Sequence, residues 1–402
     1  MAGTVLTTTI RRRLYTFADG IARPFSDSRR RRFLRDMLTG LVVAGHVHLT
    51  AIARANSRGA GNIHAAEKRL SRHLASEHWD ASPLADELLR RSAAQVGEDT
   101  LIVADTTDLA KYYARHLEGL GRVHDGSDPG KRTAPGYCLF EAYARVGKWQ
   151  LFPLVLEPLK VYAGAPTGEN AEILGHVLRA HAATGGRGTW VMDRGFDRRE
   201  LFGPLIRNGV AFVVRQRGDR MVRAADGREL SVEALAAEQV CPRPRRWPRG
   251  GVAVTVEVQL PEVGEAPFLL VVGWLYPQSA RPLLLLVSPA ARRPRRTGRW
   301  FVKAYRRRWG VEDATRGIKQ QFTVERFLVR SWMSICRLLW LVAWAFWWLN
   351  LWGEEQFRRL RTALLRHPWR IAKEVTYLFD WIARMIHALL HPHPRWPAED
   401  TG

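Results

Sequence analysis

The spacing of apolar residues divides the chain into a helical beginning and a mixed middle. Over residues 1–98, apolar residues recur at helical intervals and basic runs stand at positions 11–13 and 29–32, so we predict a helical, basic N-terminal region. After it, short apolar runs take over. Two of these runs, residues 100–105 and 189–193, predict buried strands that each end in an aspartate.

A predicted hairpin and a predicted helix lie between these two strands. Residues 140–146 and 151–156 are apolar segments joined by a short turn, which is typical of a hairpin. Residues 170–183 have the pattern of a helix, and residues 211–217 predict a further strand. Strand, hairpin, helix and strand together indicate a mixed α/β core.

The next part of the chain changes to alternation of apolar and polar residues. Residues 252–260, 268–276 and 283–287 predict a small antiparallel sheet that is inserted into the core. The chain then returns to helix, first as one predicted helix over residues 299–322 and then as the Trp-rich segment 331–352.

The charge of the chain changes this picture from a generic α/β protein to one with a polyanionic partner. Its 402 residues include 62 Lys and Arg against 39 Asp and Glu, a formal net charge of +23. Most of the cations are Arg, which binds phosphate through two hydrogen bonds, so nucleic acid is the expected partner. The basic N-terminus is interpreted as an arm that contacts DNA.

Three widely spaced cysteines, Cys138, Cys241 and Cys336, predict neither a disulfide framework nor a zinc site. A reducing cytosol fits this usage best. The Trp-rich segment is nearly long enough to cross a bilayer, but Arg337 and Asn350 interrupt it, and the twelve residues between them favour a buried core helix. We therefore expect no membrane partner.

Three segments carry the candidate chemistry. Asp105 and Asp193 each follow an apolar strand, where α/β sheets gather functional groups, although an isolated Asp there is more often a cap or turn residue. Tyr305, Arg308 and Glu312 are separated by 3 and 4 residues, and Lys319 follows 7 residues later. On one helix these four side chains fall within about 60° of one another. The alternative is an exposed charged helix with incidental ion pairs.

The Tyr, Arg, Glu and Lys intervals resemble the YREK signature of IS4-type insertion-sequence transposases, within the DDE superfamily. The segments ADTTDLAK, at Asp105, and DRGFD, at Asp193, are similar to the regions that carry the first and second catalytic Asp of that family. The resemblance covers roughly residues 99 to 350. Because Asp313 stands beside Glu312, the choice of Glu312 depends on the register of the signature.

The resemblance implies an RNase H-like mixed-sheet core with a β-rich insertion, and we place the domain boundaries accordingly. The expected parts are a helical DNA-binding domain (1–98), the first core part (99–217), the β-rich insertion (218–290), the second core part (291–352) and a helical C-terminal region, which ends in a disordered tail and offers a dimer contact (353–402).

The same resemblance implies a mechanism and its residues. Asp105, Asp193 and Glu312 would hold two Mg²⁺ ions, which Mn²⁺ replaces, for cleavage of the element's ends and joining of the freed 3′-hydroxyl to target DNA. Tyr305, Arg308 and Lys319 would bind phosphates near the scissile bond. We extend this role to Arg194.

The remaining predictions concern a residue that stacks on a base, the binding partners and the compartment. Trp247, among Arg and Pro in the insertion, is the candidate for stacking on a flipped base, whereas Trp274 in an apolar strand is assigned to the core. The partners are double-stranded DNA, as terminal inverted repeats and as target, and a second copy of the chain in a synaptic complex. The compartment is the bacterial cytoplasm, at the nucleoid.

Two alternatives stay open from the sequence. One is a domesticated or inactive relative that binds DNA without cutting it. The other is an RNase H-like nuclease that cuts nucleic acid without strand transfer.

Overall fold

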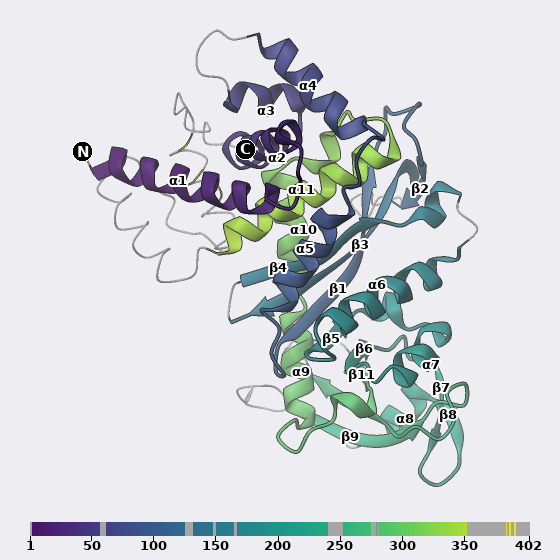
Figure 1. Cartoon of the computed structure of the whole chain (residues 1–402). Helices are drawn as coiled ribbons and strands as arrows, with labels where there is room; N and C mark the ends of the chain where they lie inside the picture. The colour runs from purple at the N-terminus through teal and green to yellow at the C-terminus, as the bar shows by residue number, and fades with distance from the viewer. Residues whose placement is uncertain are drawn as a thin grey trace.

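A mixed sheet with helices on both faces forms the centre of this computed structural model (Figure 1). The structure describes residues 2–56, 62–124, 132–147, 150–164, 167–239, 252–274, 279 and 281–351, together with Ala383, Ile386 and Leu390. Trp247 and almost all of the predicted C-terminal region 353–402 lie outside the described residues.

The core sheet combines antiparallel and parallel strands. β1 (Leu101–Ala110) pairs antiparallel with β3 (Thr133–Val146), which in turn pairs antiparallel with β4 (Gln150–Pro158). On its other side β1 pairs in parallel with β5 (Thr189–Met192), and β5 with β6 (Phe212–Arg215). The predicted strands, the hairpin and the mixed α/β class are therefore confirmed.

β1 is longer than the expected strand, which was predicted to end at Asp105. Its parallel pairing with β5 does end at Ala104, but its pairing with β3 continues to Ala110, opposite Gly136. The prediction of the end was wrong because the long strand β3 and the short edge strand β2 (Gly121–His124) continue the ladder beyond the point where β5 stops.

We expected the insertion strands to form a small sheet of their own, but they continue the core sheet. β9 (Val252–Gln259), β10 (Phe268–Trp274) and β11 (Leu283–Val287) are antiparallel to one another, as predicted. β11 also pairs antiparallel with β6, so the insertion extends the core sheet. Two strands that the sequence pattern did not predict, β7 (Met221–Ala224) and β8 (Glu229–Ser231), form the far edge beyond β9.

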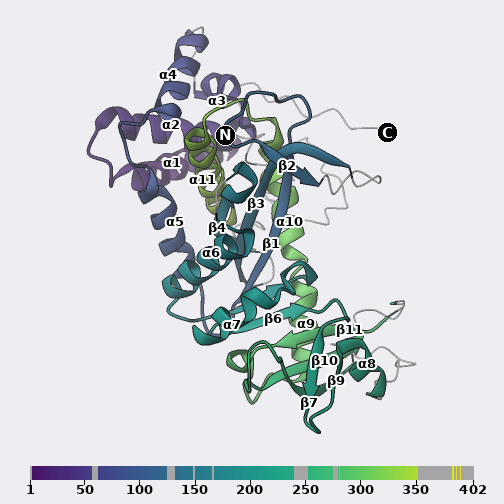
Figure 2. The ribbon, with the colours of Figure 1, turned by 90° about the vertical axis from the view of Figure 1, so that its right-hand side faces the viewer.

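Helices cover the two faces of the core sheet. α6 (Glu169–Ala183) and α10 (Gly310–Gln321) lie on opposite sides of β1 and β3 (Figure 2). Alternation along β3 shows the same arrangement, because Phe140 stacks on His176 of α6 whereas the next residue, Glu141, contacts Thr315 of α10. Further helices of the core are α7 (Arg199–Arg207) and, in the insertion, α8 (Val232–Glu238).

The N-terminal region is helical, as predicted. Its helices are α1 (Ala2–Ala22), α2 (Ser28–Ala44), α3 (Leu49–Asn56), α4 (Ile63–Ala75) and α5 (Ser82–Ala93). Asp27 and Asn62 begin two of them, since each side chain accepts a hydrogen bond from a backbone amide of the first turn. Figure 1 shows α1 to α4 gathered around α11 (Trp332–Asn350) at one end of the sheet, whereas α5 runs along β4.

The Trp-rich helix α11 is a core helix. It is long and apolar enough to cross a membrane, but most of it is buried inside the fold, against β4 and the N-terminal helices. Both polar residues that interrupt it are bound there. Arg337 donates to the backbone carbonyls of Leu74, Ser76 and Trp79, while the Asn350 side chain accepts from the Leu151 amide at 2.9 Å. These bonds satisfy buried polar groups that would otherwise be costly.

The single helix predicted over residues 299–322 is broken. α9 (Gly298–Arg307) ends at Arg307, Arg308 and Trp309 form a turn, and α10 begins at Gly310. Arg145 of β3 donates to the Arg307 carbonyl at 2.8 Å, which satisfies a helix-end oxygen at the break. Gly310 permits this approach, because a Cβ there would collide with the Arg145 guanidinium. Tyr305 and Glu312 therefore stand on different helices.

Candidate active site

Asp105 and Asp193 lie side by side at the end of the parallel part of the sheet. Ala104 pairs with Met192, so the next residue on each strand is an aspartate. The Asp105 side chain accepts from the Thr106 amide at 2.9 Å. Asp193 begins the short 3-10 helix Arg194–Phe196, where its Oδ1 accepts from the Gly195 amide at 2.7 Å. Their placement in one site follows from strand register.

The position of Asp105 raises its pKa. Burial is the largest cause, the neighbouring negative charge of Asp193 adds to it, and the positive charge of Arg308 opposes it. The resulting pKa is about 6. Two neighbouring carboxylates that repel each other favour the binding of a proton or a cation.

Arg308 links the first aspartate to Glu312. Its guanidinium donates from Nη1 to Asp105 Oδ2 and from Nη2 to Glu312 Oε1, each at 2.9 Å. The residue is only 7% exposed, whereas Glu312, in the first turn of α10, is exposed. The i, i+4 spacing of Arg308 and Glu312 brings the guanidinium beside Glu312, and its other terminal nitrogen reaches Asp105. Sequence segments around positions 105, 193 and 308–312 therefore meet in one place.

The other predicted site residues have different surroundings. Tyr305 is buried, 2% exposed, and its ring lies 5.7 Å from the Arg308 guanidinium carbon. Lys319 donates to the Asp108 carbonyl at 2.7 Å and pairs with Glu325 at 3.1 Å. Arg194 is exposed beside Asp193. Tyr305 and Arg308 are buried in this structure, whereas Arg194 is exposed and Lys319 is partly exposed.

Glu141, a buried glutamate, lies beneath the site. It was not predicted from the sequence. It stands opposite Asp105 in the β1–β3 ladder and is 1% exposed. Tyr143 donates a hydrogen bond to its Oε2 at 2.8 Å, and Oε1 contacts the Thr315 hydroxyl. The signal in the sequence is a single carboxylate inside the apolar strand that pairs with the strand of Asp105.

The surroundings of Glu141 raise its pKa. Burial is the largest cause and raises the pKa to about 8, and the negative charge of Asp105 adds to the increase. The hydrogen bonds from Thr315 and Tyr143 and the positive charge of Lys319 oppose it. The buried carboxyl therefore favours its protonated form near neutral pH.

The acidic residues fit a divalent cation by their chemistry. Hard cations such as Mg²⁺ prefer carboxylate ligands, and a cation between Asp105 and Asp193 would offset their repulsion. Among the described residues, no three acidic, His or Cys side chains are already grouped to hold a metal. We attribute this to Arg308, whose guanidinium occupies the space between Asp105 and Glu312.

This electrostatic arrangement predicts a pH dependence of metal affinity. Asp105 has a raised pKa of about 6, so at pH 5 a cation must displace a proton that is largely absent at pH 7. We expect Mn²⁺ affinity, measured by calorimetry, to increase roughly tenfold from pH 5 to pH 7. Equal affinities at the two pH values would contradict the assignment, and Asp105→Asn should remove the dependence.

Comparison with known proteins agrees with this geometry. Residues 171–348 match the family model described as transposase DDE domain, a range that includes Asp193, Arg308 and Glu312 but begins after Asp105. No curated protein matches the chain. The matched segment, together with the carboxylates that meet at the end of the parallel strands, supports a DDE transposase.

Proposed function

We propose that the chain is a DNA transposase of the IS4 type, with the YREK signature at Tyr305, Arg308, Glu312 and Lys319. It cleaves the ends of its insertion sequence and joins the freed 3′-hydroxyl to target DNA. The observation that carries this proposal is the meeting of Asp105 and Asp193 at the ends of adjacent parallel strands, with Glu312 connected to Asp105 through Arg308.

The arrangement of strands supports an RNase H-like core for this activity. Three antiparallel strands, β4, β3 and β1, are followed by β5 and β6, which run parallel to β1. The helix with Glu312 packs on the face of β1 and β3 opposite α6. We keep the proposed domain boundaries 1–98, 99–217, 218–290, 291–352 and 353–402, with the insertion as an extension of the core sheet.

In the proposed reaction, Asp105, Asp193 and Glu312 would hold two Mg²⁺ ions. Such a metal pair supplies charge stabilisation for both the attacking and the leaving oxygen of a phosphodiester. Lys319 and Arg194 are accessible and bind flanking phosphates. Arg308 neutralises Asp105 and Glu312 in the structure, and its guanidinium would be available to a phosphate if cations held those two carboxylates. Tyr305 packs against Arg308 and positions it.

The proposed partners follow from the charge and from the resemblance. The net charge of +23 suits double-stranded DNA, as terminal inverted repeats and as target. Trp247 as a stacking residue and the C-terminal region as a dimer contact in a synaptic complex are proposals about residues outside the described ones. The proposed location is the bacterial cytoplasm, at the nucleoid.

Cleavage and joining assays separate the proposal from its two alternatives. A substrate that carries the inverted repeats flanking the gene is incubated with Mg²⁺ and a target plasmid. The transposase releases ends and joins them to the plasmid. A nuclease of the same core would release ends without joining them, and a DNA-binding relative would do neither.

Arg308→Gln should tighten metal binding. The substitution removes a positive charge that lies 2.9 Å from each of two proposed metal ligands. At pH 8 we expect roughly tenfold tighter Mn²⁺ binding by calorimetry, together with weaker DNA cleavage. Arg316→Gln is the matched control, because Arg316 is an exposed arginine of α10 whose partner is Asp313. Unchanged or weaker Mn²⁺ binding in Arg308→Gln would show that the guanidinium does not compete with the cation.

A further inference from the structure

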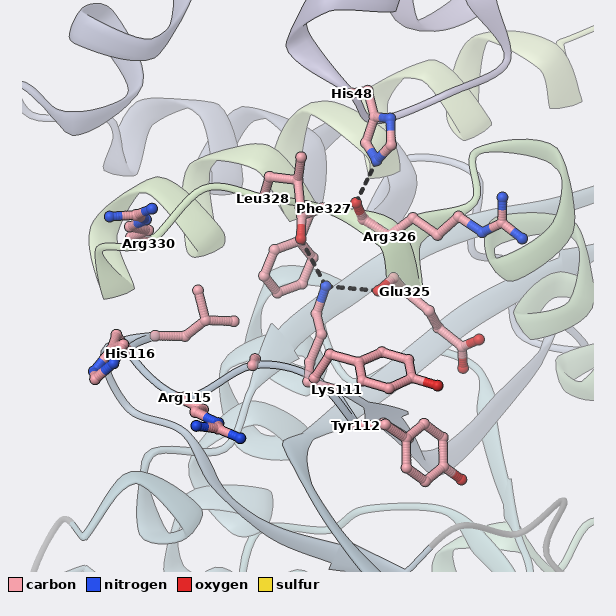
Figure 3. A pocket seen from close by; sticks show the side chains of 14 residues that line it. His48, Lys111, Tyr112, Arg115, His116, Glu325, Arg326, Phe327, Leu328 and Arg330 are labelled. Carbon is pink, nitrogen blue, oxygen red and sulfur yellow. Dashed lines mark hydrogen bonds between the residues drawn. The ribbon is translucent and has the colours of Figure 1, made fainter.

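A cleft lies at the end of β1, next to the candidate active site. Its volume is about 790 Å³. Its lining comes from the segment 110–117 that follows β1, from the segment 325–330 between α10 and α11, and from His48 of the N-terminal region. Figure 3 shows Lys111 reaching across the cleft to the carbonyls of Glu325 and Phe327, at 2.6 and 2.8 Å.

The cleft exposes aromatic surface that the fold does not use. Tyr113 is 99% exposed and Tyr112 is 56% exposed, and Leu328 on the opposite side is 74% exposed. Phe327 is buried beneath, with the Lys111 ammonium 3.4 Å from its ring centroid. Exposed neighbouring tyrosines have apolar faces and polar tips, which suits a planar ligand that stacks.

The rim of the cleft is positive. Arg115, Arg326 and Arg330 line it and are exposed, together with His116. The one acidic residue among the lining residues is Glu325, whose carboxylate pairs with Lys319 at 3.1 Å. An anionic partner with planar groups is therefore complementary to the cleft in charge as well as in shape.

The location connects the cleft to the candidate active site. Ala110 follows Asp105 by five residues on the same strand, a distance of roughly 17 Å at about 3.3 Å per residue. Lys319 stands between them, since it binds the Asp108 carbonyl and Glu325. Duplex DNA advances about 3.4 Å per base pair along its axis, so this distance equals about five base-pair steps of B-form DNA.

We propose that this cleft binds an unpaired nucleotide of the DNA strand that passes through the active site, with its base stacked on Tyr112 and Tyr113. Arg115, Arg326 and Arg330 hold the adjacent phosphates. This inference rests on the proposed function for the identity of the ligand, and it adds a single-strand subsite at the end of β1 that is separate from the acidic residues.

Binding of a fluorescein-labelled oligothymidylate to the full chain in EDTA tests the subsite without catalysis. Each stacked base contributes roughly 1–3 kcal/mol, so the double substitution Tyr112→Ala and Tyr113→Ala should weaken binding at least about fivefold. The corresponding double Phe variant should bind like the wild type, because stacking needs the ring and not the hydroxyl. Met221→Ala, at an exposed apolar residue of β7 on the far edge of the sheet, is the control and should have no effect.

A second readout locates the ligand directly. With 5-iododeoxyuridine in the oligonucleotide, irradiation should attach it to Tyr112 or Tyr113, as identified by peptide mass spectrometry. Unchanged affinity of the double Ala variant, or adducts confined to other segments, would overturn the proposal. A change in oligomeric mass without a change in DNA binding would instead make the cleft a protein contact and also overturn it. If the wild type does not cleave DNA, the proposed function is contradicted, but the binding result for this subsite stands.

Discussion

Asp193→Asn is expected to lower Mg²⁺-dependent cleavage and joining of the element's ends by at least about a thousandfold, equivalent to roughly 4 kcal/mol in the barrier. Asn keeps the shape of the side chain and can still accept the hydrogen bond from the Gly195 amide. The fold at the start of the short helix Arg194–Phe196 is therefore preserved. What is lost is the negative charge beside Asp105.

The matched control for this substitution is Asp86→Asn. Asp86 is an exposed aspartate of α5 that pairs with Arg179 at 3.0 Å, and exposed pairs of this kind contribute about 1 kcal/mol or less. Its variant should cleave and join like the wild type. DNA binding by Asp193→Asn in EDTA should also be unchanged. If Asp193→Asn cleaves as fast as Asp86→Asn, Asp193 is not a metal ligand.

Glu141→Gln should change the pH dependence of stability. The pKa of Glu141 is raised from its usual value to about 8, so the folded state keeps a proton that the unfolded state loses above about pH 4.5. The wild type therefore loses stability as the pH rises through this window. Gln is neutral throughout and keeps hydrogen-bonding atoms for Tyr143 and Thr315. Relative to the wild type, it should gain about 4 kcal/mol between pH 4.5 and pH 8.

Chemical unfolding of the two proteins at pH 5 and pH 8 measures this difference. Glu238→Gln is the control of opposite sign, because Arg228 lowers the pKa of Glu238 by hydrogen bonding at the surface. Its stability contribution is present at neutral pH and is lost as the pH falls. A constant difference between Glu141→Gln and the wild type at both pH values would show that Glu141 is ionised in the folded protein.

Local patterns predicted most of the strands and helices, because apolar periodicity reports directly on burial. The strand 189–193, the helix 170–183 and the three insertion strands were found with small errors at their ends. The break at Arg308 was not found. The residue that binds the Arg307 carbonyl at this break is Arg145, which is far away in the sequence.

The site was predicted in part for a related reason. The placement of Asp105 and Asp193 at strand ends indicated that they could meet, and the structure brings them together through the register of β1 and β5. Glu141 could not be recognised, since its importance arises from the antiparallel register that sets it opposite Asp105. The burial of Tyr305 and Arg308 likewise follows from tertiary packing and not from their spacing.

The most direct test of a shared metal site is a change of metal specificity in three single Cys variants, at Asp105, Asp193 and Glu312. Mg²⁺ prefers oxygen ligands, whereas softer metals accept thiolates. We predict that each variant loses cleavage and joining with Mg²⁺ and recovers measurable activity with Mn²⁺. A variant that remains active with Mg²⁺, or three variants that no thiophilic metal restores, would contradict the claim that these carboxylates form one metal-dependent centre.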